Sequence, residues 1–314
     1  MSTSAPSILC PIDFSEASRG ALRYAGAIAE HVGGRLIVLT VDDPLLTSVA
    51  AQAGLTSMAD ESRRELHHAI DEAFTDAPPV ARTLDVRVAV GKPAEEILRV
   101  AREQDVELLV MSSHGRSGVS KHFFGSTTER VLRSTDVPVL VTPAGAGGGA
   151  SLADVARHVH RIIVPVDLSG ASPHQLRVAA GIGKALGLPL IVTHVLEPVA
   201  VPPRIRRLLA GTDAERRVDA ETRLGELAAS VTDGTPVETL PLVGDPPQEI
   251  VKLADARDGG LIVMGLHSSG LLGPRMGAVT YRVLCTTKSL VLALPPVPDA
   301  APDRAGFERI VICL

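Results

Sequence analysis

The sequence has no tryptophan, and aromatic residues make up only 2% of its 314 residues. A core without many rings is built from Ala, Val, Leu and Ile, which suits layered α/β packing. The chain also lacks a dense Lys/Arg run and carries a formal net charge of −5. Because nucleic-acid binding uses basic patches and stacking rings, we do not expect a nucleic-acid partner.

Cysteine is also sparse: the three residues are Cys10, Cys285 and Cys313, and none belongs to a CxxC pair. Such usage is typical of a reducing compartment, with buried and unreactive thiols. The first residues show no basic segment followed by an apolar one. No apolar run reaches the roughly 20 residues that a membrane helix needs. We therefore expect a cytoplasmic protein without a membrane segment.

Motifs of several enzyme classes are missing. There is no G-x-x-x-x-G-K-[ST] phosphate loop, and the first apolar run ends in Pro11–Ser15 rather than in G-x-G-x-x-G. These absences argue against P-loop NTPases and Rossmann dehydrogenases. No plausible nucleophile or third partner accompanies His114 or His122 in the sequence, so loop solvation or local packing explains them better than base catalysis does. The sequence predicts no catalytic residue and no resident metal site.

Short apolar runs alternate with segments of helical periodicity, which predicts parallel sheets covered by helices on both faces. Strands are expected in the first half at Ser7–Ile12, Arg35–Val41, Val80–Val90, Glu107–Met111 and Val137–Val141. Helices are expected at Glu16–Val32, at Met58–Phe74 and from Pro93 onward. Asp43–Ser57 is expected to form an irregular loop. Pro138 favours an edge position for the last strand.

The pattern then repeats. Asp167 lies 154 positions after Asp13, and Gly244 lies 153 positions after Gly91, each in a matching context. A nearly constant offset indicates a tandem duplication. We predict domains at residues 1–143 and 159–296, a Gly-rich linker at 144–158 and a Pro-rich tail at 297–314. The final segment of the tail, 307–314, resembles a strand that covers a sheet edge of this chain or of a partner.

One stretch, Glu107–Ser126, combines a strand, a small-residue loop and a helix start. Its glycines are Gly115, Gly118 and Gly125, and Ser126 with Glu129 has the S-x-x-E pattern of a capping box. A loop of this kind directs main-chain N–H groups at a pocket by the positive end of a helix. That arrangement is suited to an anion such as a phosphate.

These features resemble the universal stress protein family over both halves. The matching parts are Pro11–Ser15, the second strand ending at Val41, the Gly91-Lys92-Pro93 turn, and the block from Met111 to Ser126. Nucleotide-binding members carry Gly, two residues, Gly, nine residues, then Gly-Ser or Gly-Thr. Here Gly115, nine residues and Gly125-Ser126 match, whereas Ser112 stands at the first glycine.

The resemblance implies two tandem Rossmann-like domains of the adenine nucleotide alpha hydrolase type, each an open five-stranded parallel sheet. It also implies that ATP or another adenine nucleotide binds in the first half, with Mg²⁺ arriving as the counter-ion of the phosphates and at most slow hydrolysis. Base and ribose would lie against Pro11, Asp13, Val41 and Met111. The phosphates would lie on the main chain of Ser112, Gly115, Gly125, Ser126 and Thr127. In the alternative interpretation, Asp13 caps the next helix and Ser126 belongs only to a capping box.

The second loop departs further from the family pattern. Ser268 replaces the second glycine, the following spacer is eight residues long, and Gly277-Ala278 lacks the hydroxyl. We therefore expect the second half to complete an internal pseudo-dimer rather than to hold a nucleotide. A second functional class stays open: a scaffold or interaction module that binds no nucleotide and acts through dimerisation, including a possible homodimer.

Overall fold

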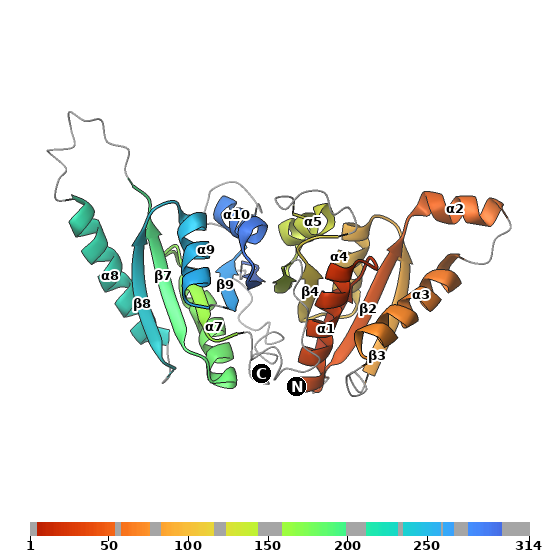
Figure 1. Cartoon of the computed structure of the whole chain (residues 1–314), viewed down its shortest axis with the longest axis horizontal. Helices are drawn as coiled ribbons and strands as arrows, with labels where there is room; N and C mark the ends of the chain where they lie inside the picture. The colour runs from red at the N-terminus through yellow and green to blue at the C-terminus, as the bar shows by residue number, and fades with distance from the viewer. Residues whose placement is uncertain are drawn as a thin grey trace, which may run out of the picture.

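The computed structural model describes residues 5–53, 58–75, 83–115, 124–143, 159–198, 212–231, 235–258, 260–266 and 276–296. Strands and helices alternate through both halves (Figure 1). The first half contains β1 (Ser7–Pro11), α1 (Glu16–His31), β2 (Arg35–Asp42), α2 (Pro44–Gln52), α3 (Met58–Ala73), β3 (Thr83–Val90), α4 (Pro93–Glu103), β4 (Leu108–Ser112), α5 (Ser126–Ser134) and β5 (Val139–Thr142). The second contains β6 (Ile162–Pro165), α7 (Ser172–Leu186), β7 (Leu190–Leu196), α8 (Thr212–Val231), β8 (Val237–Val243), α9 (Pro246–Ala256), β9 (Leu261–Gly265), α10 (Ala278–Thr286) and β10 (Leu290–Leu294).

The strands form one 10-stranded sheet in the order β3-β2-β1-β4-β5-β10-β9-β6-β7-β8. Each half has the same internal order and is parallel throughout, which confirms the predicted fold class. The exception is the β5–β10 pair, which is antiparallel and joins the two halves. The sequence therefore encodes two open sheets that merge into one.

The β5–β10 junction is symmetric at the residue level. Leu140 lies opposite Leu292, and the two residues have the same place in their own halves. A local twofold relation between the halves therefore passes between these side chains, as in an isologous interface. The predicted edge position of the last strand is wrong, because β10 covers β5. Pro138 precedes the strand instead of interrupting it, and its carbonyl oxygen accepts from the Leu109 N–H at 2.9 Å.

Buried side chains lie on both faces of the sheet. On one face, Ile8 and Cys10 of β1 belong to a core with residues of α1 and α3. On the other, Leu9 belongs to a core with residues of α4 and α5. Because both faces are covered, the central strands are continuous aliphatic runs rather than alternating ones. Burial also raises the pKa of the Cys10 thiol, in keeping with an unreactive core cysteine.

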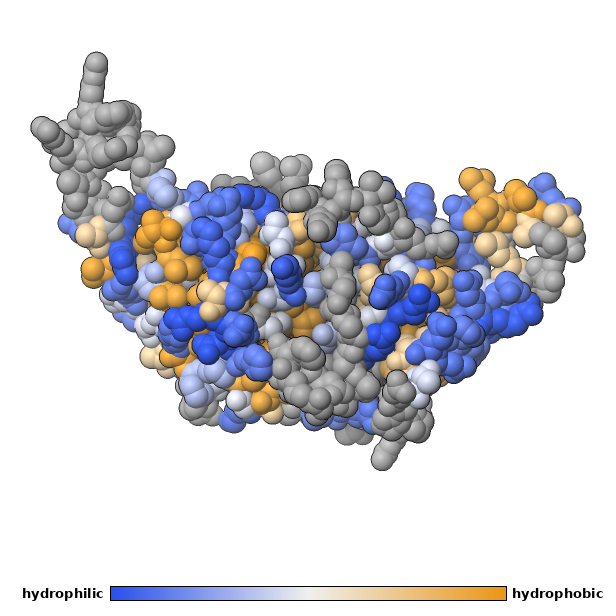
Figure 2. Space-filling model, viewed as in Figure 1, coloured by the Kyte–Doolittle hydropathy of each residue, from blue (hydrophilic) through white to orange (hydrophobic). Residues whose placement is uncertain are grey.

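Helix α2 corrects the prediction of an irregular loop at Asp43–Ser57. The Asp43 carboxylate caps the helix by accepting the Leu45 N–H at 2.7 Å, and Pro44 occupies the first helical position. An acidic cap before proline is a helix-start signal, so the sequence contained the information. Leu45, Leu46 and Val49 are 75%, 59% and 60% exposed. They lie on α2, the helix beneath the orange surface at the upper right of Figure 2.

Candidate functional site

The first-half site lies where the strand order reverses. From β1 the chain continues to β2 on one side, whereas β4 and β5 lie on the other. In open α/β sheets, the carboxyl ends of the strands at such a switch point border a ligand crevice. Pro11 and Ser112 end β1 and β4, Met111 directly precedes Ser112, and Val41 lies one residue before the end of β2. The topology thus brings these four predicted residues to one edge of the sheet.

Asp13 lies just beyond β1 and is held by the start of α1. The Ser15 N–H and hydroxyl both donate to Asp13 Oδ1, at 3.1 and 2.5 Å. Ser15 is itself the N-cap of α1, because its Oγ accepts the Ser18 N–H at 3.2 Å. The alternative in which Asp13 caps this helix is therefore wrong. Phe14, between Asp13 and Ser15, adopts a φ of 64°, which is unusual for a non-glycine residue. This turn of the backbone accompanies the hydrogen bonds from Ser15 to Asp13.

Gly115 lies directly against this carboxylate. A Cβ atom at position 115 would lie 2.6 Å from Asp13 Oδ2, far inside van der Waals contact. A Cβ at Gly125 would meet the Ser113 carbonyl oxygen at 3.3 Å and the Gly115 nitrogen at 3.8 Å. The structure therefore brings Asp13, Gly115 and Gly125 together. Both glycines are needed for close approach, because a side chain at Gly115 would occupy the space beside Asp13.

Ser112, the departure from the family pattern, is 8% exposed and is bonded within the chain. Its hydroxyl donates to the His114 carbonyl oxygen at 2.7 Å, and its own carbonyl oxygen accepts from Thr128 Oγ1 at 2.9 Å. The Ser113 hydroxyl lies 2.8 Å from His114 Nδ1. The His114 ring therefore has a polar partner on the neighbouring residue. Gly118 and His122, which the sequence also singled out, lie outside the described residues, as do the linker and tail.

The start of α5 overturns the capping-box prediction. The N-cap is Gly125, with no side-chain cap, and Glu129 forms an ion pair with Arg133 at 2.7 Å. The first helical bond runs from the Glu129 N–H to the Gly125 carbonyl oxygen at 2.9 Å. Within the described residues, the main-chain N–H groups of Ser126, Thr127 and Thr128 donate to no protein acceptor. Three N–H groups at the positive end of a helix form a local environment that attracts an anion.

Two hydrogen bonds join the end of the loop to the end of β4, one from a main-chain N–H and one from a side chain. The Gly125 N–H donates to the Ser113 carbonyl oxygen at 2.8 Å, and Thr128 reaches Ser112 as described above. The second half repeats both: Gly277 donates to Leu266 at 2.8 Å, and Thr280 Oγ1 donates to the Gly265 carbonyl oxygen at 2.8 Å. Sequence reasoning missed Thr128 and Ser15, although both recur in the second half, as Thr280 and Ser169. The repeat was therefore the signal that could have found them.

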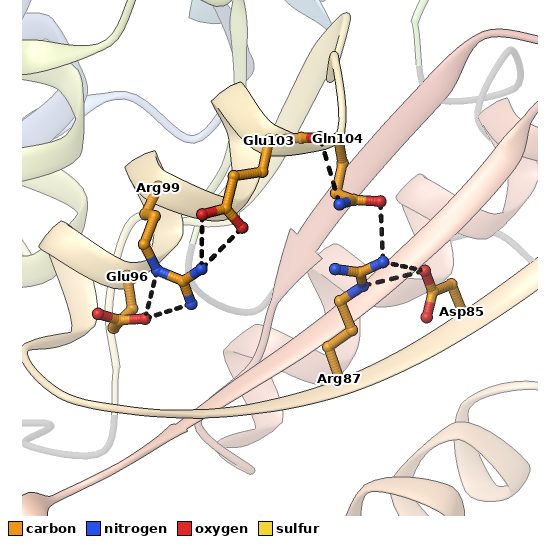
Figure 3. Close-up of polar contacts among 6 residues, drawn as sticks. All are labelled: Asp85, Arg87, Glu96, Arg99, Glu103 and Gln104. Carbon is orange, nitrogen blue, oxygen red and sulfur yellow. Dashed lines mark hydrogen bonds and ion pairs between the residues drawn. The ribbon is translucent and has the colours of Figure 1, made fainter.

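A second polar cluster lies near the amino end of the β3 edge, and its polar side chains bond to one another. Asp85 accepts from Arg35 and from Arg87 Nε at 3.0 Å, and Gln104 Oε1 accepts from both arginines at 3.1 and 2.8 Å. Figure 3 shows part of this network beside Arg99, which bridges Glu96 and Glu103 on α4. Burial opposes ionisation of Asp85, but the two arginines outweigh it and lower its pKa below the ordinary 3.8. We assign this cluster to stability rather than to ligand binding.

Fold and site together define a doubly wound α/β protein in two tandem copies, with an anion-type loop at the switch point of the first copy. The profile of the Universal stress protein family matches residues 6–143 and 158–295. The chain therefore belongs to the universal stress protein family, in a tandem UspA-like form.

Individual relatives agree with this assignment. The universal stress protein MJ0577 of Methanocaldococcus jannaschii is 30% identical over 156 residues, which cover 45% of this chain and 96% of that protein. The universal stress protein Mb2028c of Mycobacterium bovis is 27% identical over 233 residues, 72% of this chain and 74% of that protein. A universal stress protein structure from Archaeoglobus fulgidus superposes with a TM-score of 0.63 at 21% identity, covering 94% of this chain and 98% of that chain. None of the described helices is both long and apolar enough to cross a membrane.

Proposed function

We propose that this protein is a stress-response or regulatory protein that binds ATP or another adenine nucleotide in its first half. The observation that carries the proposal is the junction of Asp13, Gly115 and the three N–H groups at the start of α5. From Gly115 through Gly125-Ser126, its spacing is that of the nucleotide-binding members of the family, while Ser112 stands at the first glycine. A carboxylate suited to ribose hydroxyls and an N–H cluster suited to phosphate lie at the switch point, on the carboxyl edge of the sheet where such folds bind ligands.

The roles follow the chemistry of each group. Asp13, oriented by Ser15, accepts from the ribose hydroxyls, while Pro11, Val41 and Met111 form the apolar wall for the base. Ser112, Gly115, Gly125, Ser126 and Thr127 offer main-chain groups to the phosphates. Mg²⁺ arrives with those phosphates rather than in a resident site. The sequence contains no P-loop, so the proposal includes at most slow hydrolysis. It also places the protein in the cytoplasm.

The binding stoichiometry tests this proposal. The full chain is purified without added nucleotide and denatured, and the released compounds are identified by chromatography. A second sample is incubated with ATP and freed of the excess before it is denatured. In this sample we expect about one adenine nucleotide per chain. Two per chain would show that the second loop is also competent. None, together with no thermal shift on addition of ATP, would reject the proposal.

A second candidate function, an interaction module acting through self-association, is favoured by the β3 edge. The two outer strands of the sheet are β3 and β8. Pro241 in β8 has no main-chain N–H to donate to a further strand, whereas β3 contains no proline. An antiparallel pair of β3 strands centred on Val86 would place Asp85 of each copy opposite Arg87 of the other. Opposite charges in such cross-strand pairs are favourable, so the edge is self-complementary for a second copy.

Sedimentation velocity of the full chain distinguishes this alternative. A concentration-dependent dimer that becomes a monomer in Val86→Pro, with the far-UV spectrum unchanged, would support it. A chain that stays monomeric at high concentration would reject it. The domain limits 1–143 and 159–296 likewise remain proposals, which limited proteolysis would test.

A further inference from the structure

The phosphate-loop end of the first half touches the second half of the chain. Phe124 directly precedes Gly125, and its ring is 6% exposed. Its ring centroid lies 6.2 Å from that of Tyr281 on α10, with an angle of 74° between the ring planes. This edge-to-face geometry is the favoured arrangement of an aromatic pair. In a chain with five phenylalanines and two tyrosines, one such pair lies across the two halves, at the candidate loop.

Cys285 adds a second contact at the same place. One helical turn after Tyr281, Cys285 packs with Tyr281 against the core cluster that contains Phe124. Burial raises the pKa of the thiol, which keeps it uncharged in this contact. Phe124 therefore packs against two side chains of α10. Figure 1 shows α5 and α10 next to each other at the junction of the halves.

The contact is not matched by the opposite half. The positions equivalent to Tyr281 and Cys285 on α5 are Glu129 and Arg133, which pair with each other at 2.7 Å. The position equivalent to Phe124 is Met276, which has no ring. The aromatic contact thus supports only the first loop. Phe124 is bonded directly to Gly125, and the Gly125 N–H donates to the Ser113 carbonyl oxygen at 2.8 Å, which closes the loop.

We propose that the second half is a positioning element for the anion loop of the first: Tyr281 and Cys285 hold Phe124, and Phe124 fixes Gly125 and the first turn of α5. The regulatory part of this inference, coupling between the half–half junction and nucleotide affinity, rests on the proposed function. The ordering of the loop by α10 does not. The second half thereby has a role that does not require a ligand of its own.

The test uses Tyr281→Ala in the full chain, with Tyr281→Phe as the conservative variant and Arg282→Ala as the matched control. Arg282 lies on the same helix, but it pairs with Asp245 of its own half at 2.8 Å. Amide hydrogen exchange is measured for residues 124–129 without ligand, and ATP affinity is measured by calorimetry. Loss of the edge-to-face pair predicts about three- to tenfold faster exchange and similarly weaker ATP binding in Tyr281→Ala. Both are retained in Tyr281→Phe and Arg282→Ala.

The two readouts separate the possible failures. Unchanged exchange at 124–129 in Tyr281→Ala would overturn the positioning role, whether or not the protein binds ATP. Faster exchange with unchanged ATP affinity would overturn the coupling to the nucleotide site. If the wild type binds no ATP, the proposed function fails, while the exchange measurement still decides whether α10 orders the loop. If Arg282→Ala had the same effects, a general weakening of α10 would explain them, and the positioning role of Tyr281 would be overturned.

Discussion

The two halves share a scaffold but differ at the carboxyl edge of their sheets. Asp13 and Asp167 both accept an N–H from the serine two residues later, at 3.1 and 2.9 Å. Phe14 and Leu168 both have positive φ values, 64° and 59°. Differences begin in the loop, where Ser126 is replaced by Ala278 and the spacer is one residue shorter. The comparison teaches that the strand–loop–helix closure belongs to the shared fold, whereas the loop residues differ, and on the proposed function these residues set which half binds an anion.

The amino ends of the two outer strands differ as well. In the first half, Asp85 is shared by two arginines and its side chain is 26% exposed. In the second, the equivalent Glu238 pairs with Arg257 alone, at 3.1 Å, and both side chains are more than 40% exposed. Because solvent screens exposed pairs, the first arrangement contributes more to stability. This edge therefore differs in its ion pairing, while the carboxyl edge differs in the residues to which we assign nucleotide binding.

Gly115→Val should have the largest effect on the contrast between the halves. The new side chain would have to displace the Asp13 carboxylate, since even its Cβ would lie 2.6 Å from Oδ2. We expect at least about a hundredfold loss of ATP affinity, because small displacements at a preorganised site are costly. Calorimetry measures the affinity, and thermal unfolding verifies the fold. Gly225→Ala, where the added Cβ meets nothing within 4 Å, is the control. Full affinity in Gly115→Val would reject the site.

Asp13→Asn and Asp167→Asn form the next comparison. The first removes a charged acceptor facing the crevice, and we expect about tenfold weaker ATP binding, the usual loss for one charge-assisted hydrogen bond. The second changes the equivalent group beside the altered loop and should leave ATP affinity unchanged. Both variants are titrated with ATP under identical conditions. Equal losses in the two variants would show that the halves do not differ as proposed.

The smallest effects concern the amino edges. At pH 7, Asp85→Asn should lower the free energy of unfolding by about 1 kcal/mol, and Glu238→Gln by less than about 0.5 kcal/mol. Since the pKa of Asp85 is lowered in the folded state, its contribution is present above the unfolded pKa and is lost as pH falls through the folded one. Urea unfolding between pH 7 and pH 3 measures this. If the difference in unfolding free energy between the wild type and Asp85→Asn stayed constant with pH, it would contradict the stabilising role assigned to the Asp85 carboxylate.

Much of the fold was predictable because its signals are local. Aliphatic runs buried on both faces, helical periodicity and the repeat predicted the β/α alternation and the two copies, and the structure confirms the fold class. Helix α2 was predictable too, from Asp43 and Pro44, although its Leu45, Leu46 and Val49 are exposed rather than buried against the core. Ser126 and Glu129 misled in the opposite way. A capping box requires the serine at the N-cap, and Gly125 holds that position.

By itself, the sequence determined the family, the parallel order within each half and the glycine spacing of the loop, because these depend on periodicity and neighbouring residues. Only the tertiary structure decided what meets across long sequence separations. It placed Asp13 against Gly115 and bonded the start of α5 to the end of β4. It also paired β5 with β10 and brought the Tyr281 ring into contact with the Phe124 ring. Such contacts depend on how strands and helices pack, and no local pattern specifies which distant side chains will lie within a few ångströms of each other.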